Sequence, residues 1–179
     1  MLEEFAAAAI DAEDKDELID EMMTRYGQDI LRLVFSYVEN EAIAEELTQD
    51  IFVKCYKSLH TYRGKSTLKT WLWRIAINHC KDFLKSWYNK KVINTGEELL
   101  NNKPSNEAVE QTVIQKEEEG QLVSTLMDLP IKYREVIFLF YYEELSIKEI
   151  AMMTEVGENT VKTRLRRAKQ LLKERLEGK

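Results

Sequence analysis

The sequence predicts an all-α protein made of two small helical domains joined by a flexible linker. Apolar residues recur at helical spacing along most of the chain, and only two prolines and six glycines occur among its 179 residues. The helical pattern is lost over residues 89–120, where Asn, Gly, Pro and Glu cluster. The boundaries that we expect are an N-terminal extension over 1–21, a first domain over 22–88, a linker over 89–120 and a second domain over 121–179.

The first 60 residues predict an acidic leader followed by two helices. Residues 1–21 fit a helix, a frayed tail or an interaction arm, and we favour a solvated leader. Helical spacing then predicts a helix over 26–38 and, after a break at Asn40, another over 41–60. Phe52, Val53 and Tyr56 lie beside the apolar arc of the second helix. Its opposite face is mostly acidic, which alone indicates no more than a solvated surface, and carries Glu45, Glu46, Gln49, Asp50, Lys54 and Lys57.

A loop over residues 61–66 leads into a third helix, which Ser66 or Thr67 can cap and which should end near Tyr88. Trp73 and Trp87 belong to its apolar arc. The remaining arc is basic, holds one aromatic ring and comprises Trp71, Arg74, Asn78, Lys81 and Lys85. Cations bind phosphates and aromatic rings stack on unpaired bases, so this arc suits nucleic acid. For Trp71, core packing and base stacking both remain open.

The end of the chain predicts a helix-turn-helix. A short helix is expected over 121–127. The next helix, over 131–143, contains the apolar run Val136 to Tyr142, which should be the core of the second domain. Ser146 and Glu149 have the spacing of a capping box, which predicts a helix over 147–153. Gly157 is the residue that can adopt a positive φ in the turn, and Glu158 or Asn159 can cap a last helix reaching Leu176. An ordinary amphipathic helix with a solvated basic face is the alternative.

Charge is distributed in blocks along this chain of net charge −6. Residues 1–60 carry fifteen acidic and five basic side chains, whereas residues 61–91 carry one and eight. Residues 159–179 carry eight basic and two acidic side chains. Two basic segments in an acidic chain predict two separate contacts with a polyanion and an acidic face that meets something else.

Several classes of function lack support in the sequence. It contains no P-loop, dinucleotide fingerprint or nucleophile elbow, and no carboxylate pair stands out as an acid–base couple. Cys55, His60, His79 and Cys80 have no metal-ligand spacing, so we expect no metal, cofactor, small-molecule substrate or catalytic residue. Two cysteines and no membrane-spanning apolar run make a cytoplasmic protein the default.

Four groups of residues together resemble one family, in order and spacing, over residues 22–176. They are residues 44–54, 69–78, 129–137 and 149–168, which include Ala-Glu-Glu-Leu-Thr-Gln-Asp, Lys-Thr-Trp-Leu-Trp-Arg-Ile-Ala, Leu-Pro with Tyr-Arg-Glu-Val-Ile, and Thr-Val-Lys-Thr-Arg-Leu-Arg-Arg-Ala. This pattern resembles the extracytoplasmic-function (ECF) sigma factors of bacteria. The resemblance implies a region 2 helical bundle and a region 4 helix-turn-helix domain, with no enzymatic activity.

The resemblance also implies roles for particular residues. The acidic face is similar to the surface that binds the clamp helices of the largest polymerase subunit. The polymerase-binding residues implied are Glu45, Glu46, Gln49, Asp50 and Lys54. The residues implied in opening the −10 element and capturing a flipped base are Tyr62, Arg63, Lys65, Ser66, Trp71, Arg74, Asn78 and Lys81. Those implied at the −35 element are Asn159, Thr160, Lys162, Thr163, Arg164, Arg166, Arg167, Lys169 and Gln170.

The partners implied are core RNA polymerase, through its clamp helices and flap, promoter DNA, and an anti-sigma factor, which in this family is often membrane-anchored. Two features depart from the family. Glu155 stands where the turn often has Gly, and the N-terminal extension is longer than in many members. A helix-turn-helix regulator that does not bind polymerase is the alternative, and it predicts a dimer on palindromic half-sites. An all-helical enzyme is a third reading that no site supports.

Overall fold

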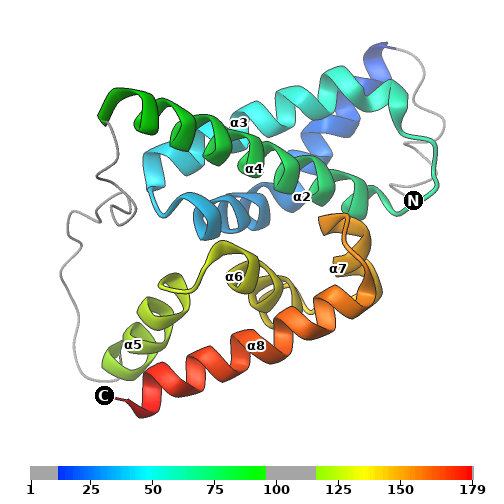
Figure 1. The fold of residues 1–179 in the computed structure, drawn as a ribbon. Helices are drawn as coiled ribbons and strands as arrows, with labels where there is room; N and C mark the ends of the chain where they lie inside the picture. The colour runs from blue at the N-terminus through cyan, green and yellow to red at the C-terminus, as the bar shows by residue number, and fades with distance from the viewer. Residues whose placement is uncertain (1–11, 96–115, 179) are drawn as a thin grey trace. The chain divides into compact units, whose positions relative to one another are not determined.

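The computed structural model describes residues 12–95 and 116–178, which form helices joined by short turns, with no strand among them. This confirms the all-α fold class. The chain divides into two compact units, Met1–Pro104 (unit 1) and Ser105–Lys179 (unit 2), whose helices are labelled in Figure 1. The turn residues expected around Gly96 and over 101–106 lie outside the described residues.

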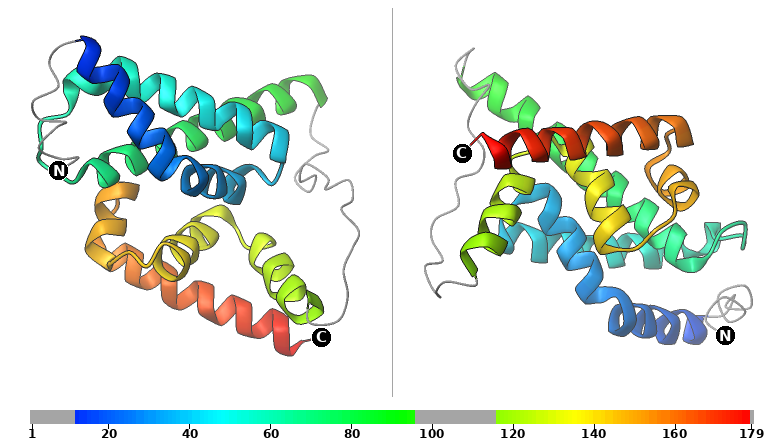
Figure 2. Two further views of the ribbon diagram at one scale, coloured as in Figure 1. Left: turned by 180° about the vertical axis from the view of Figure 1, so that it is seen from behind. Right: turned by 90° about the horizontal axis from the view of Figure 1, so that it is seen from below.

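Unit 1 is a bundle of three long helices. They are α2 (Ala12–Val38), α3 (Glu41–Ser58) and α4 (Leu68–Thr95), and each packs against the other two (Figure 2). The side chain of Asn40 caps α3 by accepting a hydrogen bond from the Ile43 N–H at 2.9 Å. The fully buried large residues at the centre of the bundle are Leu18, Met22, Ile30, Leu33, Ile51, Leu68, Leu72, Trp73 and Ile77.

The solvated leader expected for the first 21 residues is wrong where the structure describes them. Residues 12–21 are the first turns of α2, and Leu18 and Ile19 are 0% and 7% exposed. Burying an aliphatic side chain of this kind stabilises a fold by about 1.5–3 kcal/mol. The beginning of α2 is therefore part of the bundle, and residues 1–11 lie outside the described residues.

The third helix is longer than predicted. It was expected to end near Tyr88, but α4 continues to Thr95, into the segment assigned to the linker. The chain has no Gly or Pro between Lys65 and Thr95, so nothing there ends a helix. Asn and Lys in residues 89–95 suggested a linker by composition, but both residue types are tolerated on an exposed helical surface.

Unit 2 is organised around its last helix. It comprises α5 (Lys116–Met127), α6 (Ile131–Ile137), the π-helical segment η2 (Phe138–Tyr142), α7 (Ile147–Thr154) and α8 (Glu158–Glu177), and α8 contacts α5, α6 and α7. Where one helix over 131–143 was predicted, the backbone changes to π-helical at Phe138. Tyr141 and Tyr142 are 53% exposed, so the expectation that they belong to the core is wrong.

The capping box predicted at the start of α7 is confirmed. The Ser146 hydroxyl accepts from the Glu149 N–H at 3.2 Å, and the Glu149 carboxylate accepts from the Ser146 N–H at 2.8 Å. These two bonds satisfy backbone donors that a helix start otherwise leaves unpaired. They fix the direction in which α7 enters the helix-turn-helix.

The turn between α7 and α8 differs from the prediction in its conformation. The residue with positive φ is Glu155, at φ 57° and ψ 37°, and its N–H donates to the Ala151 carbonyl. Gly157 has φ −67° and is the N-cap of α8, so neither Glu158 nor Asn159 caps that helix. The left-handed position follows from how α7 ends, because a helix commonly closes on one left-handed residue directly after its last turn.

Candidate nucleic-acid and polymerase interfaces

The polar face of α3 projects into solvent along its length. Every residue that the sequence analysis assigned to polymerase binding is exposed, and that set is Glu45, Glu46, Gln49, Asp50 and Lys54. Val53 and Tyr56 were expected beside the core arc, yet they are 51% and 42% exposed and lie on this same face. The face therefore combines carboxylates with apolar area, a combination that suits a protein partner better than a solvated surface.

The beginning of α2 supports one end of this face. The Tyr56 hydroxyl donates a hydrogen bond to the Asp16 carboxylate, and this bond, with the negative charge of Asp16, raises the pKa of Tyr56. Asp16 lies in the segment for which the sequence offered no role. Asp16 on α2 therefore lies within reach of the exposed Tyr56 hydroxyl on α3.

The loop between α3 and α4 is closed by its own side chains. After the 3₁₀ turn η1 (Leu59–Thr61), the Tyr62 hydroxyl donates to the Ser66 carbonyl at 2.8 Å. Gly64 adopts φ +66°, a conformation that glycine reaches without a steric penalty. Arg63 and Lys65 on either side of it are exposed. The loop thus holds two cations outward on a short, closed backbone.

Trp71 lies under this loop and is buried. It is 5% exposed, and the Tyr62 ring packs against it with centroids 5.6 Å apart and planes tilted by 59°. The helical wheel placed Trp71 on the basic arc, and that assignment is wrong because the loop folds back over the first turn of α4. Trp71 therefore has no free face on which a base could stack, and its position makes it a support for Tyr62.

The basic arc of α4 continues beyond Trp71 as a helical stripe. Arg74, Asn78 and Lys81 are half-buried, and each is three or four residues from the next, so they lie on one face. Lys85 extends the stripe and is exposed. The residues predicted to bind the −10 element thus form two groups. One is a loop whose two cations are exposed, and the other is a stripe of half-buried side chains on α4.

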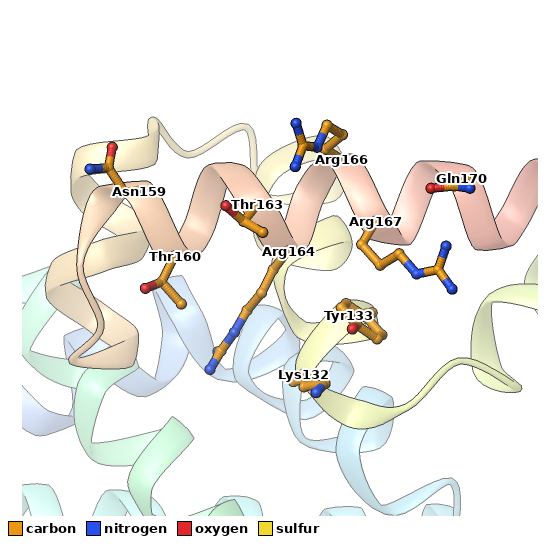
Figure 3. A pocket seen from close by; sticks show the side chains of 9 residues that line it. All are labelled: Lys132, Tyr133, Asn159, Thr160, Thr163, Arg164, Arg166, Arg167 and Gln170. Atoms are coloured by element: carbon orange, nitrogen blue, oxygen red, sulfur yellow. The ribbon is translucent and has the colours of Figure 1, made fainter.

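In unit 2 an open groove of about 690 Å³ lies between α8 and the beginning of α6 (Figure 3). Seven of the nine residues that the sequence assigned to −35 binding line this groove, and they are Asn159, Thr160, Thr163, Arg164, Arg166, Arg167 and Gln170. Lys162 and Lys169 are exposed on α8 but do not line it. Lys169 instead sits 5.3 Å from the centroid of the Tyr141 ring.

Two residues of the groove were missed by sequence reasoning. Lys132 and Tyr133 come from the beginning of α6 and line the groove opposite α8. They lie 26 and 25 residues before the first residue of α8, so no local pattern could pair them with it. A helix-turn-helix is commonly accompanied by backbone contacts from an earlier helix, and that was the signal that could have found them.

Arg164 has a partner inside the protein. Its guanidinium lies 3.7 Å from the Glu135 carboxylate, whose side chain is 1% exposed, whereas Arg164 itself is 24% exposed. Figure 3 shows Arg164 extending from α8 on the side where Lys132 and Tyr133 lie. The Arg164 charge is therefore engaged in holding α8 to α6. Arg166 and Arg167 are exposed on α8, and the Arg167 guanidinium lies 3.9 Å from the exposed Glu174 carboxylate of the same helix.

Comparisons with known proteins show the family of the chain. Residues 22–88 match Sigma-70 region 2, and residues 119–172 match Sigma-70, region 4. The RNA polymerase sigma factor SigV of Bacillus subtilis is 33% identical over 154 residues, covering 84% of this chain and 86% of SigV. The ECF RNA polymerase sigma factor SigM of the same organism is 32% identical over 155 residues, covering 87% of this chain and 93% of SigM.

The chain belongs to the ECF sigma factors. As a member of that family, it is a transcription initiation factor that works with core RNA polymerase. Solved structures share its fold. One is the sigma factor RpoE from Bartonella quintana in complex with the anti-sigma factor NepR. It has a TM-score of 0.70 and 20% sequence identity, and the match covers 88% of this chain and 96% of RpoE. CnrH, in complex with the cytosolic domain of CnrY, has a TM-score of 0.69 and 21% identity, covering 99% and 96%.

In this sigma factor, none of the helices within residues 12–95 and 116–178 has the length and apolar character needed to cross a bilayer. Over the same residues, no three His, Cys, Asp or Glu side chains gather as a candidate metal site. The described surface thus offers three candidate interfaces: the exposed face of α3, the loop and stripe of α4, and the groove beside α8.

Proposed function

We propose that unit 1 binds core polymerase through α3 and opens the −10 element with the loop and stripe of α4, while unit 2 reads the −35 element with α8. The observation that carries this proposal is the groove of unit 2, where Arg166, Arg167 and polar side chains of α8 converge with Lys132 and Tyr133. Two arginines on an exposed helix can each bind a guanine edge through two hydrogen bonds. Lys132 then binds the backbone phosphates beside that groove.

The interface for polymerase is the exposed face of α3. Its carboxylates steer an encounter with a basic partner, and the apolar area of Val53 and Tyr56 supplies burial once contact is made. The side chain of Asp50 is 59% exposed, so its charge is available for such an encounter. We assign Val53 and Tyr56 to this interface together with the five polar residues that the sequence analysis gave it, which are Glu45, Glu46, Gln49, Asp50 and Lys54.

The interface for the −10 element is the closed loop of Tyr62 to Ser66 with the stripe of Arg74, Asn78 and Lys81. Arg63 and Lys65 point outward and meet phosphates, and the stripe holds the strand that follows. Trp71 takes part indirectly, by supporting Tyr62. Separating the first bases costs a few kcal/mol, and phosphate contacts offset part of it.

We further propose that the protein acts in the cytoplasm and that an anti-sigma factor controls it. RpoE of Bartonella quintana binds such a factor, and unit 2 here has exposed apolar side chains on α5 and η2 that can be covered. Leu122 and Val123 on α5 are 48% and 57% exposed, and Tyr141 and Tyr142 of η2 are each 53% exposed. Patches of this kind on a soluble domain mark protein contacts.

Transcription in vitro tests the main proposal. Purified core polymerase and this chain should initiate at a defined start on a linear promoter, whereas the chain alone should bind that promoter weakly because its acidic segments repel DNA. Initiation requires both components if the proposal is right. A chain that binds tightly as a dimer to palindromic DNA and leaves core polymerase inactive would be a regulator of the other class.

Charge reversal on α3 tests the polymerase interface. Asp50→Lys should compete less well for core polymerase than the parent chain, without unfolding unit 1. Asp20→Lys on α2 is the matched control, because Asp20 is also an exposed aspartate of the same bundle. If Asp50→Lys competes as well as the control does, the face of α3 is only solvated.

A further inference from the structure

Three arginines of α8 differ in the carboxylate that each one meets. The Arg164 guanidinium lies beside the buried Glu135 carboxylate of α6. The Arg167 guanidinium lies 3.9 Å from the exposed Glu174 carboxylate of its own helix. Arg166 is exposed and forms no ion pair among the described residues of unit 2. Arg167 is therefore neither locked into the fold nor free, because an exposed neighbour restrains it.

Glu174 also binds a second side chain of the groove. The Gln170 Nε2 atom donates a hydrogen bond to Glu174 Oε1 at 2.9 Å, and the same oxygen faces Arg167. Gln170 and Arg167 lie four and seven residues before Glu174, so the three side chains share one face of α8. Figure 3 shows Arg167 extending toward the end of α8 that carries Gln170, whereas Arg164 extends the opposite way. One carboxylate oxygen thus holds two of the side chains that line the groove.

The position of this carboxylate is unusual for a basic helix. Residues 159–179 carry two acidic side chains, Glu174 and Glu177. Glu177 lies 3.7 Å from Lys173, which is not assigned to DNA. Glu174 instead lies beside side chains proposed to read the −35 element. A carboxylate there repels phosphates and weakens binding to every duplex, so any benefit to recognition must come from the way in which it orients its neighbours.

We propose that Glu174 is a positioning residue for −35 recognition, which holds the Arg167 guanidinium and the Gln170 amide in the direction of the base edges. This inference rests on the function proposed above. A free arginine can turn to the phosphates, which are the same along every duplex. A restrained arginine loses less conformational entropy when it binds a base edge, and it reaches fewer phosphates. Glu174 therefore increases the difference in affinity between a matched promoter and a mismatched one.

The two restrained groups keep the atoms that they need to read bases. The Arg167 guanidinium has five N–H donors, and two of them suffice for the O6 and N7 atoms of guanine. The Gln170 amide gives one N–H to Glu174 and keeps its second N–H and its carbonyl oxygen. Adenine presents one donor and one acceptor in the major groove, and the amide that Glu174 holds has one group to match each.

Selection of −35 sequences by the holoenzyme tests the inference. Core polymerase with the parent chain or a variant binds a promoter library whose −35 element is randomised, and sequencing of the bound DNA gives the preference at each base pair. Arg166→Ala, Arg167→Ala and Gln170→Ala show which base pairs each side chain reads. Glu174→Gln should reduce the preference by about threefold at the base pairs that Arg167→Ala and Gln170→Ala identify. The preference at the base pair that Arg166→Ala identifies should not change.

Glu177→Gln is the matched control, because it makes the same change in net charge three residues further along α8 and frees a lysine that is not assigned to DNA. It should leave every preference as in the parent. A second control combines two substitutions. In the Arg167→Ala background, Glu174→Gln should cause no further loss at the base pair assigned to Arg167.

The outcomes separate this inference from the function on which it rests. An equal loss in Glu177→Gln would mean that net charge alone is responsible, and a loss spread evenly over all base pairs would mean that Glu174 only helps to place α8. Either result, or an unchanged preference in Glu174→Gln, would overturn the inference and leave −35 recognition by α8 intact. Preferences that stay unchanged in both Arg166→Ala and Arg167→Ala would instead overturn the proposed function itself.

Discussion

The two basic helices of this protein carry similar charges and present them in different ways. On α8, eight of the nine residues assigned to DNA are exposed, and only Arg164 is partly buried. On α4, Trp71 is buried, and Arg74, Asn78 and Lys81 are half-buried. The same residue types therefore stand out from one helix and lie against the bundle on the other.

The difference fits two ways of holding DNA. A helix proposed to enter the major groove needs exposed polar and cationic side chains, and α8 has them. A surface that holds a separated strand gains from side chains already restricted in motion, because less conformational entropy is lost on binding. The aromatic packing of Trp71 with Tyr62 and of Trp73 with Tyr26 gives α4 that rigid base.

The largest effect should come from removing the support under the α4 loop. Trp71→Ala should lower the free energy of unfolding of unit 1 by about 3–5 kcal/mol, because it leaves a large cavity beneath Tyr62. Urea unfolding followed by tryptophan fluorescence measures this selectively, since all three tryptophans lie in unit 1. Trp71→Phe, which keeps an aromatic ring, should lose far less. Normal stability of Trp71→Ala with weakened −10 binding would return Trp71 to the DNA surface.

The next effect should separate two arginines of α8 that look alike in sequence. Arg164→Ala removes the guanidinium that lies 3.7 Å from the buried Glu135 carboxylate, and this should lower the free energy of unfolding of unit 2 by about 3 kcal/mol. Arg167→Ala should leave stability within about 0.5 kcal/mol but weaken −35 binding by about 1–3 kcal/mol. Thermal unfolding by circular dichroism and holoenzyme binding to promoter DNA distinguish them. If both variants behaved alike in both assays, the division of α8 into a packed and a reading side would be wrong.

Features that depend on neighbouring residues could be predicted from the sequence. The capping box of Ser146 and Glu149 follows from spacing within one helix, and the structure has it. The same spacing predicts an apolar stripe on α8 made of Val161, Leu165, Ala168, Leu172 and Leu176. The first three are buried, whereas Leu172 is half-buried and Leu176 is 38% exposed. The exposed acidic face of α3 follows from the same periodicity. The division into two helical units followed from a loss of that periodicity.

Features that depend on distant residues could not be predicted. Trp71 is covered by a loop that closes through the hydrogen bond of Tyr62 to the Ser66 carbonyl, and a helical wheel contains no loop. The partner of Arg164 is Glu135, on another helix of unit 2. Lys132 likewise lines the groove from α6, a helix that is distant from α8 in sequence.

The smallest effect should come from His79, where the packing of α4 against α3 alters a titration. Its Nε2 is buried without a hydrogen-bond partner and lies 3.9 Å from the Asp50 carboxylate. Burial and the positive charge of Lys54 on α3 lower the pKa of His79, while Asp50 and Asp82 oppose that shift. Both histidines of the chain lie in unit 1, so histidine titration affects unit 1 alone.

The sign of the effect follows from the direction of the shift. Above pH 6.5, the ordinary pKa, His79 is neutral in both the folded and the unfolded chain and does not affect stability. As the pH falls below 6.5, the unfolded chain takes up the proton first, so the free energy of unfolding of unit 1 should fall until the folded pKa is passed. Urea unfolding at pH 7.5 and at pH 5.5 measures how much the free energy of unfolding falls between the two pH values. This fall should be smaller in His79→Gln than in the parent. In His60→Gln, which changes the exposed histidine, it should equal the fall in the parent. Equal losses in both variants would mean that α3 and α4 pack too loosely around His79 to perturb its pKa. The contrast between a packed α4 and an open α8 would then be weaker than the burial of their side chains indicates.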